Sequence, residues 1–484
     1  MSQFNEDNTV EQMLISQAQD LGWEYVAADQ IPRTTDSILV DEWVVESLVR
    51  INGITVDQAE QVLFQLRGII ASGNNPSNLV QANDDFRKKI YEENSFPFGK
   101  DGEHIPIKFF ADKESGIPNH CVVTNQWEFP RPSINGGKRL DLVFLINGIP
   151  MIIVEAKTPV RPQVTWADGA TDIIHYQKSI PEMFVPNILA FASDGKELQY
   201  GTVGASIEHW GPWYADEDRR HGMIEDVRHN FAFLMHPERL LDIYRFYTVF
   251  TSKSDGKKLK IVCRYQQYLG GEAIVNRVVN TSRAGHGPRK GLIWHFQGSG
   301  KSWLMVFTAQ KLRLMPELHA PTIVIVDDRI DLEDQITGDF TRAEVPNLES
   351  APSKEDLEKF FKGNPHGKIL ITTIFKFGDV DEVLTRQSNI IVMVDEAHRT
   401  QEKDLGKKMR TALPNAFFFG LTGTPINRHD HNTFAAFGAE EDKGGLYLEI
   451  YLPKLSGGWC YAGTEIPDGA SRDEDQPGIA PTGV

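Results

Sequence analysis

Short apolar runs separated by helix-length polar stretches dominate the second half of the chain. Runs that are apolar at nearly every position are typical of strands in a parallel sheet that helices cover on both faces. The pattern therefore predicts an α/β region built on a parallel sheet. Five runs mark its expected strands, at residues 291–296, 321–327, 368–374, 389–398 and 416–424.

The first half of the chain follows a different pattern. Apolar positions at helical spacing predict one helix near residues 10–21 and a longer one over residues 56–70. Residues 139–146 and 151–157 have the composition of strands, and the turn between them contains Asn-Gly, which favours a tight hairpin. We expect a β-hairpin that carries an acidic residue in each arm.

Length and composition limit what the chain can be. With 484 residues it exceeds one ordinary domain, and we predict a first domain over 1–255, a second over 256–443 and an irregular tail over 444–484. The net charge of −17 argues only weakly against nucleic-acid binding, because a binding groove is a local basic patch that an acidic protein can still carry. The three cysteines include no CxxC pair, and no signal-like N-terminus or long apolar run is visible, so we expect a cytoplasmic protein that does not contact a membrane.

The acidic residues of the hairpin and a nearby lysine form the first candidate site. Glu155 and Lys157 are two residues apart, so they share one face of a strand, and the turn brings Asp141 alongside. Two carboxylates on neighbouring strands can share Mg²⁺, and the backbone carbonyl of Ala156 could add a third oxygen. Such a site would hydrolyse a phosphodiester, with Lys157 orienting the attacking water.

A plain ion pair between Glu155 and Lys157 is the competing interpretation, and the D…ExK pattern taken alone favours it. The context changes that balance. The apolar run at 152–154 leads directly into the two charges, and charges at the end of a buried strand are costly unless they are paired or used.

A glycine-rich loop after the run at 291–296 forms the second candidate site. Gly298 and Gly300 would let backbone N–H groups approach phosphate oxygens. Lys301 would reach the β- and γ-phosphates of ATP, and the Ser302 hydroxyl would bind Mg²⁺. The strict pattern has glycine where this chain has His295. The loop reads Gln297-Gly298-Ser299-Gly300-Lys301-Ser302 and predicts a P-loop.

The strand at 391–395 carries the second half of a nucleotide site. Asp395 would hold Mg²⁺, and Glu396 would position the attacking water. The tetrapeptide DEAH at residues 395–398, which ends in His398, could by itself be the start of a helix. It follows five apolar residues and a P-loop, however, and this combination strongly favours ATP binding.

Residues 139–159 resemble the PD-(D/E)xK nuclease core of the R subunits of type I restriction–modification enzymes, including the Asn-Gly-Ile-Pro turn. The resemblance implies that Asp141, Glu155 and Lys157 are the catalytic trio. It also implies that an acid on an upstream helix joins them, and Glu11 is the match.

The same family tends to carry a Gln-x-x-x-Tyr motif on the helix after the hairpin. This chain has Tyr176 at the second position but Asp172 at the first. The departure leaves the role of the helix open, and Tyr176 is as well explained as a packing residue.

The P-loop and the DEAH sequence are similar to those of superfamily 2 helicases and translocases. This resemblance implies a RecA-like fold for residues 256–443 and a glutamine that reads adenine, for which Gln267 is the better candidate of two. For each of the shorter motifs a plain loop or strand end is the alternative. The implied DNA-tracking and coupling residues are Arg329, Thr373, His398, Thr422 and Thr424.

A nuclease that precedes a superfamily 2 motor resembles type I R subunits over about residues 10–440. That resemblance implies ATP- and Mg²⁺-dependent translocation of double-stranded DNA, cleavage away from the recognition site, and methyltransferase and specificity subunits as partners. Two alternatives stay open: a nuclease–translocase of DNA repair or phage defence that works without a methyltransferase, and an ATP-binding nuclease module without motor activity.

The stretch after Pro425 bears on the last alternative. It is too short for the second RecA-like lobe that supplies arginines to ATP hydrolysis in that superfamily. We therefore expect the chain alone to bind ATP but to hydrolyse it poorly, and the tail to reflect a shortened or frameshifted reading.

Overall fold

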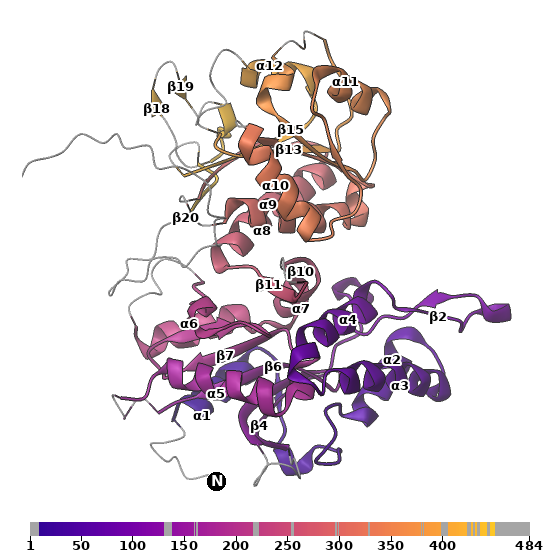
Figure 1. Cartoon of the computed structure of the whole chain (residues 1–484), viewed down its shortest axis with the longest axis vertical. Coiled ribbons are helices and arrows are strands. Elements are labelled where there is room, and N and C mark those ends of the chain that lie inside the picture. The colour runs from indigo at the N-terminus through magenta and orange to yellow at the C-terminus, as the bar shows by residue number, and fades with distance from the viewer. Residues whose placement is uncertain are drawn as a thin grey trace, which may run out of the picture. The chain divides into compact units, whose positions relative to one another are not determined.

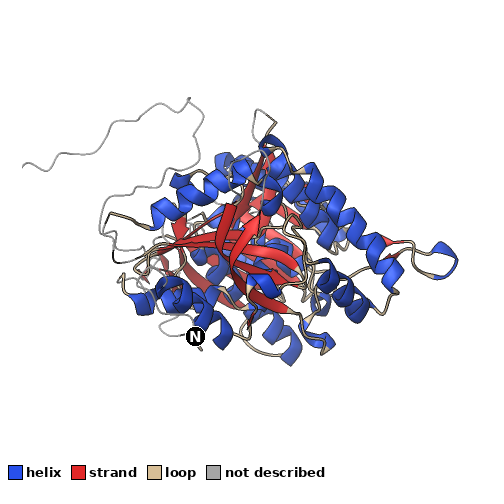
Figure 2. Cartoon of the chain, turned by 90° about the horizontal axis from the view of Figure 1, so that it is seen from below, coloured by secondary structure: helices blue, strands red, loops and turns tan. Residues whose placement is uncertain are grey.

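Two seven-stranded sheets organise the described part of the chain. This computed structural model describes residues 9–129, 138–158, 160, 163–215, 222–252, 256–295, 298, 300–327, 330–378, 380, 382–397, 405–423, 427–428, 431–432, 436–442 and 446–450. Helices flank the strands (Figure 1, Figure 2). Across these ranges, no helix combines the length and the apolar character needed to cross a bilayer.

The first sheet is mixed, with the order β1-β4-β5-β6-β7-β8-β9 and parallel pairing at β1–β4 and β6–β7. Its strands are β1 (Glu24–Tyr25), β4 (Cys121–Phe129), β5 (Lys138–Ile146), β6 (Ile149–Ala156), β7 (Leu189–Ser193), β8 (Leu198–Gly201) and β9 (Gly211–Pro212). The helices of this region are α1 (Thr9–Asp20), α2 (Asp41–Asn52), α3 (Val56–Ser72), α4 (Leu79–Tyr91), α5 (Trp166–Ser179), α6 (Ile224–Leu234) and α7 (Pro237–Phe246). Two short antiparallel pairs complete it, β2 (Ser95–Phe96) with β3 (Ile105–Pro106), and β10 (Thr248–Ser252) with β11 (Lys258–Val262).

Both helices expected from apolar spacing are confirmed as α1 and α3. The start of α3 is fixed by a capping box. The backbone N–H of Gln58 donates to the Thr55 hydroxyl at 3.2 Å, and the backbone N–H of Thr55 donates to the Gln58 side chain at 3.0 Å. These two bonds satisfy N–H groups that the first turn of a helix leaves without partners.

The predicted hairpin is also confirmed, as strands β5 and β6. Asn147 and Gly148 have positive φ values of 52° and 80°, as a tight hairpin turn requires. Gly148 is needed for a second reason, because a Cβ there would lie 2.6 Å from the backbone oxygen of Val40. The Asn147 amide donates to the backbone oxygen of Phe109 at 2.9 Å, which anchors the turn.

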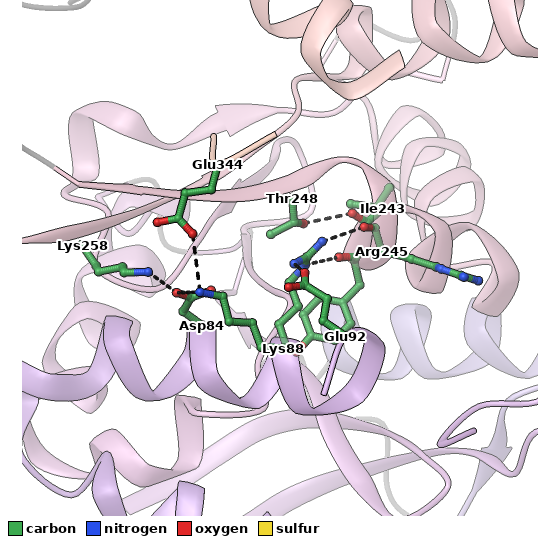
Figure 3. A network of polar contacts seen from close by, with 10 residues as sticks. Asp84, Lys88, Glu92, Ile243, Arg245, Thr248, Lys258 and Glu344 are labelled. Carbon is green, nitrogen blue, oxygen red and sulfur yellow. Dashed lines mark hydrogen bonds and ion pairs between the residues drawn. The ribbon is translucent and has the colours of Figure 1, made fainter. Parts of the chain in front are cut away.

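Helix α4 makes ionic contacts on two sides. The Asp84 carboxylate is ion-paired with Lys258 of β11 and lies 3.3 Å from Nζ of Lys88 (Figure 3). Nζ of Lys88 in turn lies 3.6 Å from the carboxylate of Glu344, which follows helix α10 (Ile330–Arg342) in the region of the second sheet. The β10–β11 hairpin is therefore held to α4 by charged side chains.

The second sheet is parallel at every described pairing, with the order β14-β15-β13-β16-β17-β12-β20. Its strands are β12 (Lys290–His295), β13 (Thr322–Asp327), β14 (Leu348–Ser350), β15 (Ile369–Thr373), β16 (Ile390–Val394), β17 (Phe417–Thr422) and β20 (Leu448–Ile450). Its helices are α8 (Tyr265–Ala284), α9 (Lys301–Arg313), α10 (Ile330–Arg342), α11 (Lys354–Lys362) and α12 (Leu405–Ala412), and β18 (Asn427–Arg428) pairs with β19 (His431–Asn432). All five predicted apolar runs are strands of this sheet, which confirms the α/β prediction.

Alternate residues of these strands enter two different cores. On β16, Ile391 and Met393 pack with the side chains of α8 and α9, while Val392 and Val394 pack with those of α11 and α12. Every residue of β13, β15, β16 and β17 is buried. Helices thus cover both faces of the sheet, as strands without polar alternation require.

Part of the expected irregular tail is regular structure. Residues 448–450 form β20, which pairs with β12. The hydroxyl of Tyr447 donates to the backbone oxygen of Ala273 at 2.8 Å, and its ring lies 3.4 Å from the Arg277 guanidinium carbon. The strand has only three residues, too few for apolar alternation to reveal it, so the sheet continues past the predicted boundary at residue 443.

Candidate functional site

The β5–β6 hairpin brings Asp141 and Glu155 together. Leu142 pairs with Val154, so one step further in the same register places Asp141 opposite Glu155. The backbone N–H of Ala156 donates to the Asp141 carboxylate at 2.9 Å. Glu155 is buried, with an exposed fraction of 2%. The two acids from separate arms therefore share one side of the sheet.

Lys157, directly after β6, contacts both the hairpin and the next helix. Its Nζ lies 3.4 Å from the Glu155 carboxylate and 2.6 Å from the carboxylate of Asp172 on α5. Gly169 lets α5 come this close, because a Cβ there would lie 3.3 Å from Cβ of Glu155 and 3.2 Å from Cβ of Ala192. Asp172, whose role the sequence left open, is thus the partner of Lys157.

Glu11 reaches the same site from α1. Its carboxylate accepts hydrogen bonds from the amides of Asn125, at 2.7 Å, and Gln126, at 3.1 Å. Gln126 has a φ of 54°, which is uncommon within a strand, while the register of β4 against β5 is the same on both sides of it. Sequence reasoning missed these two amides, because a local backbone distortion inside a strand leaves no trace in the pattern.

The carboxylates of this site have perturbed acidities. Burial raises the pKa of Glu155 well above its ordinary range, the charge of Asp141 raises it further, and Lys157 opposes the shift. Burial also raises the pKa of Glu11, where the hydrogen bond from Asn125 acts against the rise and the charge of Asp141 adds to it. The negative charges of these acids therefore lie close together, and the nearby positive charge does not balance them.

For Lys157, neighbouring charges and a hydrogen bond affect the pKa more than burial does. Burial lowers the pKa of its ammonium group, but the hydrogen bond to Asp172 and the charges of Glu155 and Asp172 outweigh burial and raise the pKa overall. Tyr176 lies close by, since burial and then the charges of Glu155, Asp172 and Asp141 raise the pKa of its hydroxyl. Lys157 accordingly stays charged, while Tyr176 stays neutral.

The donor set of the hairpin suits a hard divalent cation. One carboxylate oxygen of Glu155, Oε1, is buried and has no hydrogen-bond partner among the described residues. A buried, unpaired carboxylate oxygen beside a second carboxylate favours an added cation. The two acids alone are fewer than three protein ligands, and no group of three or more His, Cys, Asp or Glu suited to a metal occurs in the described ranges. Water and substrate oxygens would have to complete such a site.

The P-loop lies where β12 ends and α9 begins. Gly298 and Gly300 have φ values of 78° and 80°, a left-handed conformation that glycine adopts without strain. Lys301 is the first residue of α9, Ser302 follows it, and His295 closes β12 fully buried. Gln297 and Ser299 lie outside the described residues. The helix start directs backbone N–H groups toward the loop, as anion binding requires.

Strand β16 brings the acidic pair to the P-loop. Nζ of Lys301 lies 3.1 Å from the Glu396 carboxylate. Asp395 is buried and accepts a hydrogen bond from the backbone N–H of Glu396 at 2.8 Å. Glu396 has a φ of 43°, an uncommon conformation for a residue with a side chain. Residues from two distant parts of the sequence thus meet at the carboxyl ends of two parallel strands, β12 and β16, which have β17 between them in the sheet.

Gln267 joins this group from the first turn of α8. Its Nε2 donates to the backbone oxygen of Gly300 at 3.1 Å, and its Oε1 accepts from the backbone N–H of Arg264 at 2.7 Å. A Cβ at Gly300 would lie 2.3 Å from Nε2 of Gln267, so glycine is required for the contact. The glutamine therefore contacts the P-loop directly.

The remaining predicted residues are distributed around the second sheet. Thr373 ends β15 and Thr422 ends β17, and both are buried. Sequence reasoning missed Trp294, whose indole N–H donates to the backbone oxygen of Gly423 at 3.0 Å and so ties β12 to the end of β17. The predicted residues Arg329, His398 and Thr424 lie outside the described part of the chain.

Comparisons with known proteins match both regions. Residues 3–209 match the family of the type I restriction enzyme R protein N terminus, and residues 266–453 match the SWI2/SNF2 ATPase family. The HindI endonuclease subunit of a type I restriction enzyme from Haemophilus influenzae is 32% identical over 92% of this chain. The MjaIXP endonuclease subunit from Methanocaldococcus jannaschii, a putative type I enzyme, is 30% identical over 90% of it.

This chain spans 44% of the length of each of these two relatives. Among solved structures, the UvsW helicase from bacteriophage T4 is similar over 42% of this chain and 63% of that one, at 17% identity and a TM-score of 0.28.

Proposed function

Because this chain belongs to the family of type I restriction enzyme R proteins, we propose that it cleaves double-stranded DNA at the hairpin site and binds the ATP that drives translocation at the P-loop. The observation that carries the proposal is the pair of adjacent acids at the hairpin, the buried Glu155 and the partly buried Asp141, with Lys157 in contact with Glu155. Lys157 contacts only Oε2 of Glu155, and the buried Oε1 has no hydrogen-bond partner among the described residues, so a cation beside it would satisfy both acids.

At the hairpin, Asp141, Glu155 and the backbone carbonyl of Ala156 would hold Mg²⁺. A bound Mg²⁺ polarises the scissile phosphate and acidifies a coordinated water. Lys157 has the charge to orient that water or to offset charge on the phosphate, and Asp172 holds it in place at 2.6 Å. Glu11 supports the site from α1.

At the P-loop, backbone N–H groups of Gly298, Ser299 and Gly300 would hold phosphate oxygens and Lys301 would contact the β- and γ-phosphates. Ser302 and Asp395 would hold Mg²⁺, which neutralises phosphate charge. Glu396 would position the attacking water once ATP draws Lys301 away from it. Gln267 would read adenine.

The remaining assignments concern DNA and partner proteins. Arg329, Thr373 and His398 would track DNA or couple hydrolysis to movement, together with Thr422 and Thr424. Methyltransferase and specificity subunits would select the DNA site, and cleavage would occur away from it. Support for these assignments comes from the family resemblance and the order of the motifs.

Two lysine substitutions in the full chain, assembled with methyltransferase and specificity subunits, test the proposal. Lys157→Ala is expected to lower the rate of DNA cleavage about 100-fold or more, since a positioned catalytic group is typically worth that much, while ATP affinity is unchanged. Lys301→Ala is expected to remove ATP binding. Lys178→Ala, an exposed lysine on α5, serves as the matched control and should change neither quantity.

Each assignment can fail separately. Cleavage by Lys157→Ala at the rate of the unsubstituted protein would show that the nuclease site is elsewhere. Unchanged ATP affinity in Lys301→Ala would show that the nucleotide site is elsewhere. A complex that cleaves and translocates without any methyltransferase partner would favour the repair or phage-defence alternative.

A further inference from the structure

Tyr247, at the end of the N-terminal region, inserts between the two helices that begin at the candidate nucleotide site. Helix α8 carries Gln267 in its first turn, and α9 begins at Lys301. The Tyr247 side chain is fully buried, and its ring centroid lies 4.9 Å from that of Tyr268 on α8 and 5.8 Å from that of Phe307 on α9. One aromatic side chain thus packs on both helices.

The sequence of α8 makes room for this insertion at Gly271. A Cβ at that position would lie 2.7 Å from the Tyr247 hydroxyl oxygen and 3.0 Å from the Thr308 hydroxyl oxygen of α9. On the next residue, the Glu272 carboxylate accepts a hydrogen bond from the Tyr247 hydroxyl at 2.6 Å. Glycine at 271 therefore fits a close approach of Tyr247 and α9 to α8.

Lys311, in the last turn of α9, completes the contact. Its Nζ lies 2.5 Å from the Glu272 carboxylate and 2.7 Å from the carboxylate of Asp242 on α7. The lysine side chain is only 9% exposed, so its charge is neutralised by these carboxylates rather than by bulk water. We refer to Asp242, Tyr247, Glu272 and Lys311 as the Lys311 cluster.

A second ionic contact between the same regions is weaker. The Lys88–Glu344 pair in Figure 3 spans 3.6 Å, and the Glu344 side chain is 58% exposed. Exposed ion pairs contribute little, because water and salt screen them. The contacts as a whole still place both regions in one compact unit. The buried Lys311 cluster is therefore the contact that can transmit a change.

We propose that Tyr247 and Asp242 are positioning residues for the nucleotide site, although both belong to the N-terminal region. They hold α8 against α9 and so keep Gln267 in contact with the P-loop, as the bond from Gln267 to Gly300 requires. The proposal rests on the proposed ATP binding. Lys301 and Lys311 stand on one continuous helix, about 15 Å apart at 1.5 Å per residue, so a shift at one end moves the other.

The coupling must act in both directions. If the N-terminal region increases the affinity for ATP, bound ATP must stabilise the contact of the N-terminal region by the same factor. Helix α7, which carries Asp242, is the element where this stabilisation should appear. If Tyr247 and Asp242 only stabilised the N-terminal region, bound ATP would not stabilise α7 in this way.

Binding of a fluorescent ATP analogue with Mg²⁺ to the full chain is the first test. Tyr247→Phe keeps the ring and removes the hydroxyl, and Asp242→Asn keeps the shape and removes the charge. Each is expected to weaken analogue binding about fivefold or more, the lower end of the usual coupling between two sites. Arg313→Met is the matched control: it removes a cation from the same end of α9, where the guanidinium donates to the backbone oxygen of Pro346. Its affinity should stay within about twofold of the unsubstituted chain.

Amide hydrogen exchange of α7 with and without the analogue is the second test. The analogue is expected to slow exchange in α7 in the unsubstituted chain and in Arg313→Met, and to slow it much less in Tyr247→Phe. Unchanged affinity in both variants, or an unsubstituted chain that binds the analogue without any change in α7, would overturn the proposal. An unsubstituted chain that binds the analogue no better than Lys301→Ala would instead overturn the nucleotide site, and the proposal with it.

Discussion

The two candidate sites differ in how far apart their residues lie in the sequence. The hairpin site draws Asp141, Glu155, Lys157 and Asp172 from two adjacent strands and the next helix. The P-loop site draws Lys301 from the start of α9, which follows β12, and Glu396 from the segment after β16, and β17 separates these two strands in the sheet. The first therefore depends on a single turn, whereas the second depends on the order of strands in a whole parallel sheet.

The sites also differ in how their charges are balanced. At the P-loop, Lys301 contacts Glu396 directly at 3.1 Å, so the charges of the site are largely paired. At the hairpin, Nζ of Lys157 lies 2.6 Å from the Asp172 carboxylate and 3.4 Å from that of Glu155, and Oε1 of Glu155 has no hydrogen-bond partner within the described ranges. The hairpin thus has a deficit of positive charge that a cation can fill, whereas Lys301 at the P-loop already has an anionic partner.

The largest expected effect follows from the dependence on one turn. Gly148→Ala places a Cβ 2.6 Å from the backbone oxygen of Val40 at a φ of 80°. We expect it to lower the free energy of unfolding by more than about 2 kcal/mol, since the conformation alone costs about 1–2 kcal/mol, and to abolish cleavage. Gly53→Ala is the control, because Gly53 has a φ of 67° but nothing within 4 Å of a new Cβ. Denaturant unfolding that gives equal losses for the two variants would contradict the role of the turn.

The second prediction concerns the partner of Lys157. Asp172→Asn removes a charge-assisted hydrogen bond of the kind worth about 1.5–3 kcal/mol, so we expect kcat for DNA cleavage to fall about tenfold or more with little change in KM. Asp172→Glu should restore part of the activity. Thr171→Ser, at the neighbouring exposed position, is the control. A rate for Asp172→Asn equal to that of the control would remove Asp172 from the site.

Much of this arrangement was predictable from sequence, for a physical reason. Strand periodicity, the Asn-Gly turn and the glycine-rich loop are local signals, so the hairpin, the parallel sheet and the P-loop could be predicted. The partner of Lys157 could not, because the approach of α5 depends on Gly169 packing against Glu155, a contact between distant residues. The backbone distortion at Gln126 and the three-residue strand β20 could not be predicted for the same reason, since tertiary contacts determine them.

The third prediction extends the comparison to the charges between the two regions. Burial raises the pKa of Asp242 to about 6, opposed by the charge of Lys311 and assisted by that of Glu272. The folded state therefore holds this proton more tightly than the unfolded state, so the carboxyl contributes stability below its unfolded pKa of 3.8 and loses it as pH rises to about 6. The change is on the order of 3 kcal/mol.

Unfolding free energies measured from pH 4 to pH 7 check this prediction. The stability of the unsubstituted chain relative to Asp242→Asn should decline as pH rises to about 6 and stay constant above it. Glu11 and Glu155 contribute a slope of the same sign, but it is common to both proteins and cancels in the difference. A difference that increases with pH would mean that the ion pair with Lys311 outweighs burial.

The smallest expected effect lies in the P-loop site and tests its dependence on strand order. Trp294→Phe removes the hydrogen bond from β12 to the backbone oxygen of Gly423, which should cost about 0.5–1.5 kcal/mol of stability. Trp303→Phe is the control, because that ring packs on Phe307 through its apolar surface. If strand order alone determines the site, Trp294→Phe should also weaken ATP binding while DNA cleavage at the hairpin stays unchanged in a single-turnover assay at saturating ATP. A loss of cleavage under those conditions would mean that the two sites are not built independently, and the contrast between a turn-dependent and a sheet-dependent site would fail.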